Sequence, residues 1–190
     1  RDETRMTASI GHNSGRVDEP GKGWRKYAWT QARKELVPKL PLEVVRLRVR
    51  RAAELGLPYK TYAGIRASTG HDLIGFLFSS NALRVLRDGQ PIPSDREAKL
   101  VGLQNTVSTG LAHKPVTPKH LGAQPGLARA YAAPHFAQSW SAMRQDLNAI
   151  IVAQGKPADR FVMIWDSLFD RVWFAAARMA GLLSADAFFH

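Results

Sequence analysis

The sequence predicts a mainly α-helical fold, in which a single helical domain at residues 24–190 follows a flexible arm at residues 1–23. Apolar residues recur every three or four positions in most segments, and glycine or proline stands where these segments end. A chain of 190 residues with 45% hydrophobic residues can bury one core, but it is too short for a second full domain. We expect about seven helices and one long basic loop, at residues 106–135, that contains several prolines and glycines.

The N-terminal arm is expected to be flexible because it is polar and has no apolar periodicity. Residues 1–23 include four glycines, which disfavour a regular helix or strand. Within the arm, the run MTASIGHNSG at residues 6–15 resembles the start of small proteins from alphaproteobacteria and their phages. The resemblance implies a bacterial or phage setting and no particular activity.

Two basic helices are expected after the arm. The segment GWRKYAWTQARKEL, at residues 23–36, has its aromatic and small residues on one helical side and its cations elsewhere. Pro41 suits the first turn of a second helix, which continues to Leu55. A period-two alternation at Val44–Arg50 leaves a strand as the alternative, but the good helix formers at Arg51–Leu55 favour a helix.

The second of these helices is followed by a sharp break. Glycine adopts the left-handed conformation without strain, so Gly56 can end the helix, and Pro58 can open the next one. The pattern RRAAELGLPYKTYAGIR, at residues 50–66, resembles the helix-turn-helix of bacterial DNA-binding proteins. The resemblance implies that the second helix faces the major groove and that nearby arginines contact phosphates. Few residues on that helix can read base edges, so we expect modest sequence specificity.

Further helices are expected in the rest of the chain. Residues 71–89 are strongly apolar, Ser94–Glu97 has the spacing of a capping box, and residues 136–154 carry an apolar stripe. The most apolar segment, at residues 158–181, is expected to form one helix that is buried on more than one side. Aromatic anchors are typical of interfaces. The candidates for contact with a partner, or with a second copy in a homodimer, are Trp165, Phe169 and Trp173.

The charge of the chain favours an anionic partner. The net charge is +11, and residues 22–66 alone carry twelve Lys and Arg against three Glu. Residues 98–145 contain no Asp or Glu at all. Such an excess attracts polyanions, so we expect nucleic acid, duplex DNA above all, or else an acidic protein. The candidate nucleic-acid contacts are Arg46, Arg48, Arg50, Arg51, Tyr59, Lys60 and Arg66.

Several kinds of chemistry find no support in the sequence. There is no cysteine, which excludes disulfides and thiolate sites. No run of eighteen apolar residues and no signal-peptide pattern occurs, so we expect a cytoplasmic protein without membrane contact. His113, His120 and His135 lack the spacing of metal ligands. We therefore expect neither a metal nor another cofactor.

The sequence thus predicts a DNA-binding protein that is not an enzyme, such as a small bacterial or phage-type regulator. A second reading is a protein-interaction or assembly subunit that docks through its basic face and its aromatic C-terminal helix. A third reading is an enzyme that uses His71 and Asp72, or the pair Asp166 and Asp170, which we expect to lie on the surface of one helix.

Overall fold

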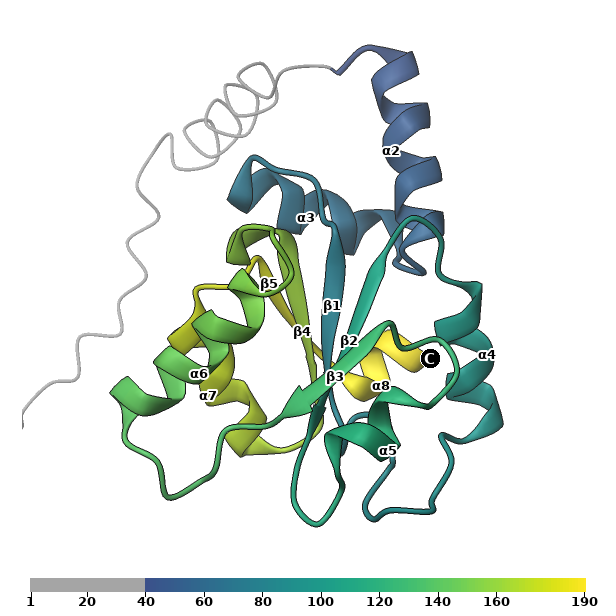
Figure 1. Ribbon diagram of the computed structural model, residues 1–190. Coiled ribbons are helices and arrows are strands. Elements are labelled where there is room, and N and C mark those ends of the chain that lie inside the picture. Colours follow the sequence, from purple (N-terminus) through teal and green to yellow (C-terminus); the bar gives the residue numbers. More distant parts are fainter. Residues whose placement is uncertain (1–39) are drawn as a thin grey trace, which may run out of the picture. The chain divides into compact units, whose positions relative to one another are not determined.

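The computed structural model describes residues 40–190 of the chain (Figure 1). Within them helices cover a five-stranded parallel sheet, so the fold is α/β and the predicted mainly α-helical class is wrong. The expected arm at residues 1–23 and the helix expected at residues 23–36 lie outside the described residues. The elements, in chain order, are α2 (Leu42–Glu54), α3 (Tyr59–Thr69), β1 (Gly75–Ser79), α4 (Ser94–Gly102), β2 (Val107–Ala112), α5 (Pro118–Gly122), β3 (Arg129–Ala132), α6 (Trp140–Val152), a 3-10 turn (Ala158–Arg160), β4 (Phe161–Trp165), α7 (Leu168–Ala177), β5 (Gly181–Ser184) and α8 (Ala185–Phe189).

The strands lie in the order β3-β2-β1-β4-β5, and every neighbouring pair is parallel. The chain builds β1 to β3 through α4 and α5, and then returns through α6 to the other side of β1 for β4 and β5. The direction of winding therefore reverses between β1 and β4. In open parallel sheets, ligands bind outside the carboxyl ends of the strands at such a point.

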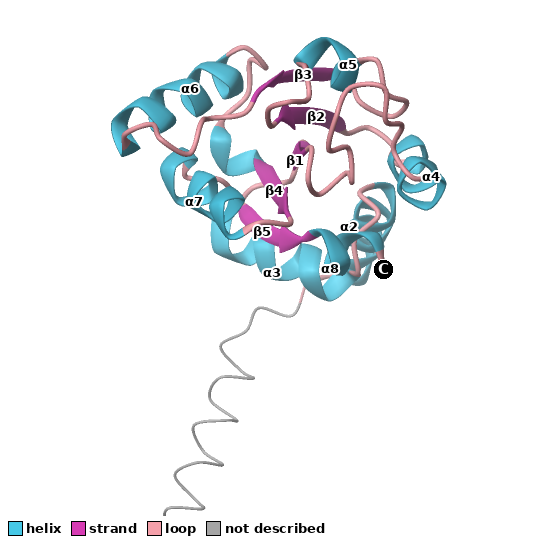
Figure 2. Ribbon diagram, turned by 90° about the horizontal axis from the view of Figure 1, so that it is seen from below, coloured by secondary structure: helices cyan, strands magenta, loops and turns pink. Residues whose placement is uncertain are grey.

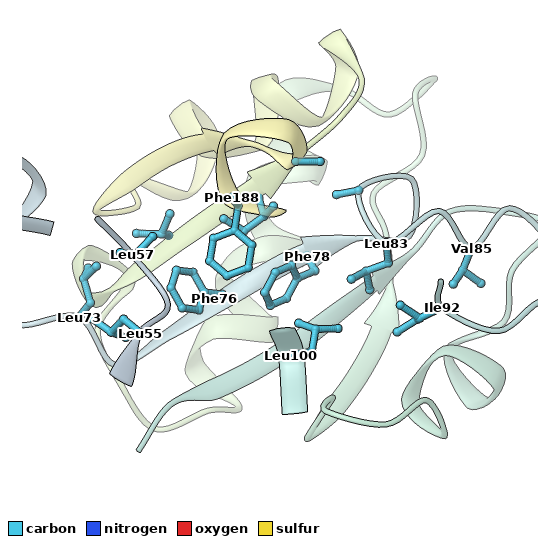
Figure 3. Packing of buried hydrophobic residues seen from close by; sticks show 14 of the residues in the cluster. Leu55, Leu57, Leu73, Phe76, Phe78, Leu83, Val85, Ile92, Leu100 and Phe188 are labelled. Carbon is cyan, nitrogen blue, oxygen red and sulfur yellow. The ribbon is translucent and has the colours of Figure 1, made fainter. Parts of the chain in front are cut away.

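Two hydrophobic clusters lie on opposite faces of the sheet. Alternate residues of β1 contribute to them, with Phe76 and Phe78 on one face and Leu77 on the other. On the first face, α8 brings Phe188 against both phenylalanines, with ring centroids 5.0 and 5.5 Å apart (Figure 3). On the second face, α6 and α7 cover the sheet, and Trp173 of α7 is fully buried there (Figure 2).

The central strands resemble helices in the sequence because they are buried on both faces. Every residue of β1 is buried, and in β4 the last residue alone is partly exposed. Such strands read as continuous apolar runs without a period of two, and a short apolar run cannot be told from a helix by periodicity. The helices expected at residues 71–89 and 158–181 are therefore wrong over β1 and β4. The second segment forms a 3-10 turn, a strand and a shorter helix instead.

The long loop expected at residues 106–135 is also wrong, because this segment forms β2, α5 and β3. The side chain of Thr117 caps α5 by accepting the backbone N–H of His120 at 3.2 Å. At Gly110 of β2, a Cβ atom would lie 2.8 Å from the side chain of Leu121. The small residue in β2 thus lets α5 pack closely on the sheet.

The two helices around Gly56 are confirmed. α2 ends at Glu54, α3 begins at Tyr59, and Gly56 has a φ of 61°, in the left-handed region. Helices also form as α4 and α6 where the sequence predicts them. The predicted capping box of α4 is wrong, since its N-cap is Pro93 and no side chain caps it.

Candidate active site at the carboxyl edge of the sheet

Three strands lead into polar residues at the same edge of the sheet. β1 ends at Ser79 and continues into Ser80, β2 is followed by His113, and β4 is followed by Asp166 and Ser167. The strands are parallel, so these residues gather at one edge. Ser80 joins two of the strand ends, because its Oγ accepts the backbone N–H of His113 at 3.1 Å.

Asp170, in the first turn of α7, is fully buried at the centre of this group. Its Oδ2 accepts the Oγ–H of Ser79 at 2.6 Å and the backbone N–H groups of Asp166 and Ser167, each at 3.2 Å. Its Oδ1 lies 2.7 Å from Nε2 of His113. The Oγ of Ser167 accepts the backbone N–H of Asp170 at 3.2 Å, so these two residues form a capping box that fixes the carboxylate.

The carboxyl group of Asp170 is ionised at neutral pH. Burial raises its pKa, but the hydrogen bonds from His113, Ser79 and Ser167 outweigh burial and hold the pKa below the ordinary value. An ionised carboxylate can only accept hydrogen bonds, so Nε2 of neutral His113 carries the proton. The other ring nitrogen, Nδ1, is then unprotonated and can act as a base.

Aromatic rings fix the imidazole of His113 as well. It stacks on Trp173, with ring centroids 4.8 Å apart and planes inclined by 26°. The ring of Phe169 lies 6.2 Å from the imidazole and 5.7 Å from the indole. Among residues 40–190, no hydrogen-bond partner reaches Nδ1 of His113. The ring is therefore held in place while its basic atom stays uncommitted.

His113 lines a cavity of about 830 Å³, which we call the His113 pocket. Its walls come from residues 112–118, which begin with the last residue of β2, and residues 132–136, which begin with the last residue of β3. Asn81, Ser167 and Phe169 complete the lining, most of which is apolar. An apolar cavity of this size with a few polar groups is typical of sites for small organic molecules. The pocket and the histidine together can hold such a molecule and exchange a proton with it.

The two aspartates expected on the surface of one helix have separate roles. Asp166 follows β4 and forms an ion pair with Arg84, in which Nη1 and Oδ2 are 2.9 Å apart. Asp170 is buried, so its expected surface position is wrong. The other acid–base candidates precede β1, at the opposite edge of the sheet. There His71 lies 3.7 Å from Asp159, and Asp72 accepts the hydroxyl of Tyr62 at 2.7 Å.

The residues that are predicted to contact DNA divide into two groups. One group is exposed or partly buried on α2 and α3, and the other, the anchored group, is held by contacts within the fold. Arg46, Arg50 and Lys60 are exposed on α2 and α3, and Arg48 and Tyr59 are partly buried. Both helices precede β1 and lie at the end of the sheet where β1 begins, opposite the strand ends that carry His113 and Asp166 (Figure 1). Of the exposed cations, Arg46 forms an ion pair with Glu43 in which Nη1 and Oε1 are 2.8 Å apart.

Arg51 and Arg66 belong to the anchored group. The guanidinium of Arg51 donates to the backbone carbonyls of Leu73 and Asn105, at 2.8 and 3.1 Å, and lies 3.3 Å from Asp72. Arg66 lies 3.5 Å from the same carboxylate. These contacts fasten α2 and α3 to the start of β1, which gives both arginines a structural task.

The three aromatic candidates for a partner contact do not share one helix. Trp165 ends β4, where the guanidinium of Arg171 lies 5.1 Å from its ring centroid. Phe169 faces the His113 pocket, and Trp173 is fully buried beneath the imidazole. Trp165 and Phe169 keep some exposure, whereas Trp173 serves the core.

The sequence interpretation missed Ser79 and considered His113 only as a metal ligand. A signal was present, because the short segments FLFSS, VSTGLAH and VMIWDS each end in polar residues. Polar residues that directly follow buried strands are typical of sites in parallel sheets. That signal becomes readable only after the runs are recognised as strands.

Comparison with known proteins gave no match, whether with family models, curated sequences or solved structures. In the part of the chain that the structure describes, no three His, Asp or Glu side chains group into a potential metal site. None of the helices within residues 40–190 is long and apolar enough to cross a bilayer.

Proposed function

We propose that the chain is an acid–base enzyme, which binds a small organic molecule in the His113 pocket and transfers a proton through Nδ1 of His113. One observation carries the proposal: a buried, ionised Asp170 holds Nε2 while the ring borders an apolar cavity of about 830 Å³. A carboxylate in this position fixes the tautomer and stabilises the imidazolium that forms when Nδ1 takes up a proton.

Ester hydrolysis illustrates the chemistry that this geometry supports. As the oxygen of a water molecule bonds to the acyl carbon, one of its protons moves to Nδ1 of His113. The bond between the acyl carbon and the leaving oxygen then breaks, and the imidazolium returns its proton to that oxygen. Ester and water become acid and alcohol, and His113 ends in its starting state.

The hydrolysis of p-nitrophenyl acetate and p-nitrophenyl butyrate by the full chain tests the proposal. We expect His113→Gln to lower the rate at least about 100-fold, because it removes the base that activates water. His71→Gln is the matched control, since His71 is exposed and lies at the other edge of the sheet. It should keep the full rate. Equal rates for the unchanged chain and His113→Gln would overturn the proposal.

Nucleic-acid binding remains a second candidate, and the exposed cations of α2 favour it. Arg46 and Arg50 are four residues apart, so they lie on one side of the helix, and both are exposed. The ion pair of Arg46 with Glu43 is itself exposed and therefore weak. An acidic protein would be attracted by the same surface. We propose the cytoplasm as the compartment for both functions.

The double variant Arg46→Ala with Arg50→Ala tests this second candidate. If both residues contact phosphates, the slope of log affinity against log salt should fall by up to about two units. The double variant Arg87→Ala with Arg144→Ala removes the same charge from exposed positions elsewhere and should leave the slope almost unchanged. Absence of binding to duplex DNA, single-stranded DNA and RNA at low salt would exclude the nucleic-acid function.

A further inference from the structure

The charge around the His113 pocket narrows the class of ligand. None of the fifteen lining residues is an Asp or Glu, whereas Lys114 lies among them. The aspartates nearby lie outside the lining: Asp170 keeps its charge but is buried among hydrogen-bond donors, Asp166 pairs with Arg84, and Asp88 accepts the backbone N–H of Thr117 at 2.8 Å. The lining itself therefore brings the positive charge of Lys114 to a ligand and no carboxylate.

The lining lacks acidic residues because of the part of the chain from which it is built. Both wall segments, residues 112–118 and 132–136, come from the stretch 98–145, which contains no acidic residue. Lys114 follows His113 directly and forms no ion pair with any carboxylate among the described residues. Lys114 is thus a cation without an ion-pair partner among the residues that line the cavity, next to His113 in the chain.

The apolar part of the lining indicates which chemical groups the uncharged part of the ligand contains. Phe136 lines the cavity but is 76% exposed, and it contacts the ring of His135 with centroids 4.6 Å apart. Phe169 contributes a second ring from the α7 side. The planar or aliphatic part of a ligand can cover the face of an exposed phenylalanine at the wall of a cavity. This contact favours binding because it removes apolar surface from water.

We infer that the His113 pocket takes an organic anion, with its charged group near Lys114 and an aromatic or aliphatic body against Phe136 and Phe169. The inference rests on the proposed function, because it assigns the ligand of the same site. A cationic ligand is disfavoured, since Lys114 would repel it and no free carboxylate lines the cavity.

Two matched probes test the ligand class on the full chain. 1-Naphthoate and 1-naphthamide share one aromatic body and differ in charge. In low salt, the carboxylate should bind up to about fivefold more tightly than the amide, which is the upper end of what one exposed ion pair contributes. The preference should shrink as salt screens the lysine. Calorimetric titration measures both affinities.

Variants locate the origin of the preference. Lys114→Met should lower the affinity for 1-naphthoate to that of 1-naphthamide and leave the amide unchanged. Lys119→Met removes the same charge from an exposed position of α5 outside the lining, and should keep the preference. If the unchanged chain binds both probes equally, or Lys114→Met keeps the preference, the anion class is wrong while the pocket remains a ligand site. If neither probe binds below about 1 mM, the proposed function fails and this inference fails with it.

Discussion

Asp170→Asn is expected to preserve the fold and to move the proton of neutral His113 from Nε2 to Nδ1. In the native protein, Oδ2 of Asp170 accepts two backbone N–H groups, which cannot reverse their polarity. The oxygen of the new amide must therefore stay on that side. Its NH₂ group then faces Nε2 of His113, at the position that Oδ1 now occupies. Nε2 can accept this hydrogen bond only if it is unprotonated.

The wrong tautomer removes the base, so ester hydrolysis should fall at least about 100-fold in Asp170→Asn. Loss of the charged acceptor should also cost about 2 kcal/mol of unfolding free energy. Long-range proton–nitrogen NMR spectra report the tautomer directly, and His113→Gln identifies the resonances. Asp186→Asn, at an exposed position of α8, is the control and should change neither the spectra nor the rate. Retention of the Nε2 proton in Asp170→Asn would contradict the account of the site.

Gly75→Ala is expected to destabilise the fold by about 3 kcal/mol. Gly75 begins the central strand and pairs with Val107 of β2 and Phe161 of β4. A Cβ atom there would lie 2.2 Å from the backbone oxygen of Val107 and 2.9 Å from the ring of Phe161. The backbone oxygen cannot move without separating β1 from β2, so the added methyl group should distort the sheet.

Thermal unfolding measures this effect, and the melting temperature of Gly75→Ala should fall by about 6–12 °C for a domain of this size. Gly64→Ala is the matched control in α3, because its Cβ atom would meet nothing within 4 Å. There alanine should stabilise the helix by about 1 kcal/mol. A melting temperature for Gly75→Ala at or above that of the unchanged chain would contradict the register of the central strands.

The sequence predicts a helix correctly where glycine or proline marks its ends and one of its faces is exposed and polar. Gly56 and Pro58 separate α2 from α3, and α2 keeps a mostly exposed polar face, so its helical period is visible. The sheet is hidden because β1 and β4 are covered on both faces by other parts of the chain. Their burial depends on partners far away in sequence, which local periodicity cannot reveal.

The candidate site was hidden for the same reason. Ser79 and Asp170 lie 91 residues apart in the chain, and His113 and Asp170 lie 57 apart, yet each pair is in hydrogen-bond contact. No local motif records these contacts, because the parallel sheet creates them by aligning the strand ends. If FLF, GLA and MIW are recognised as parts of parallel strands, the polar residues that follow them are predicted to lie together in one site.

The central claim is that the functional site of this chain is the His113 pocket. NMR titration of the isotope-labelled full chain with 1-naphthoate tests it most directly, because each backbone amide and the imidazole of His113 report binding separately. We expect saturable shifts at residues 112–118 and 132–136 and at Nδ1 of His113. Shifts that fall on α2 and α3 instead, or no saturable shift below about 1 mM, would contradict the claim.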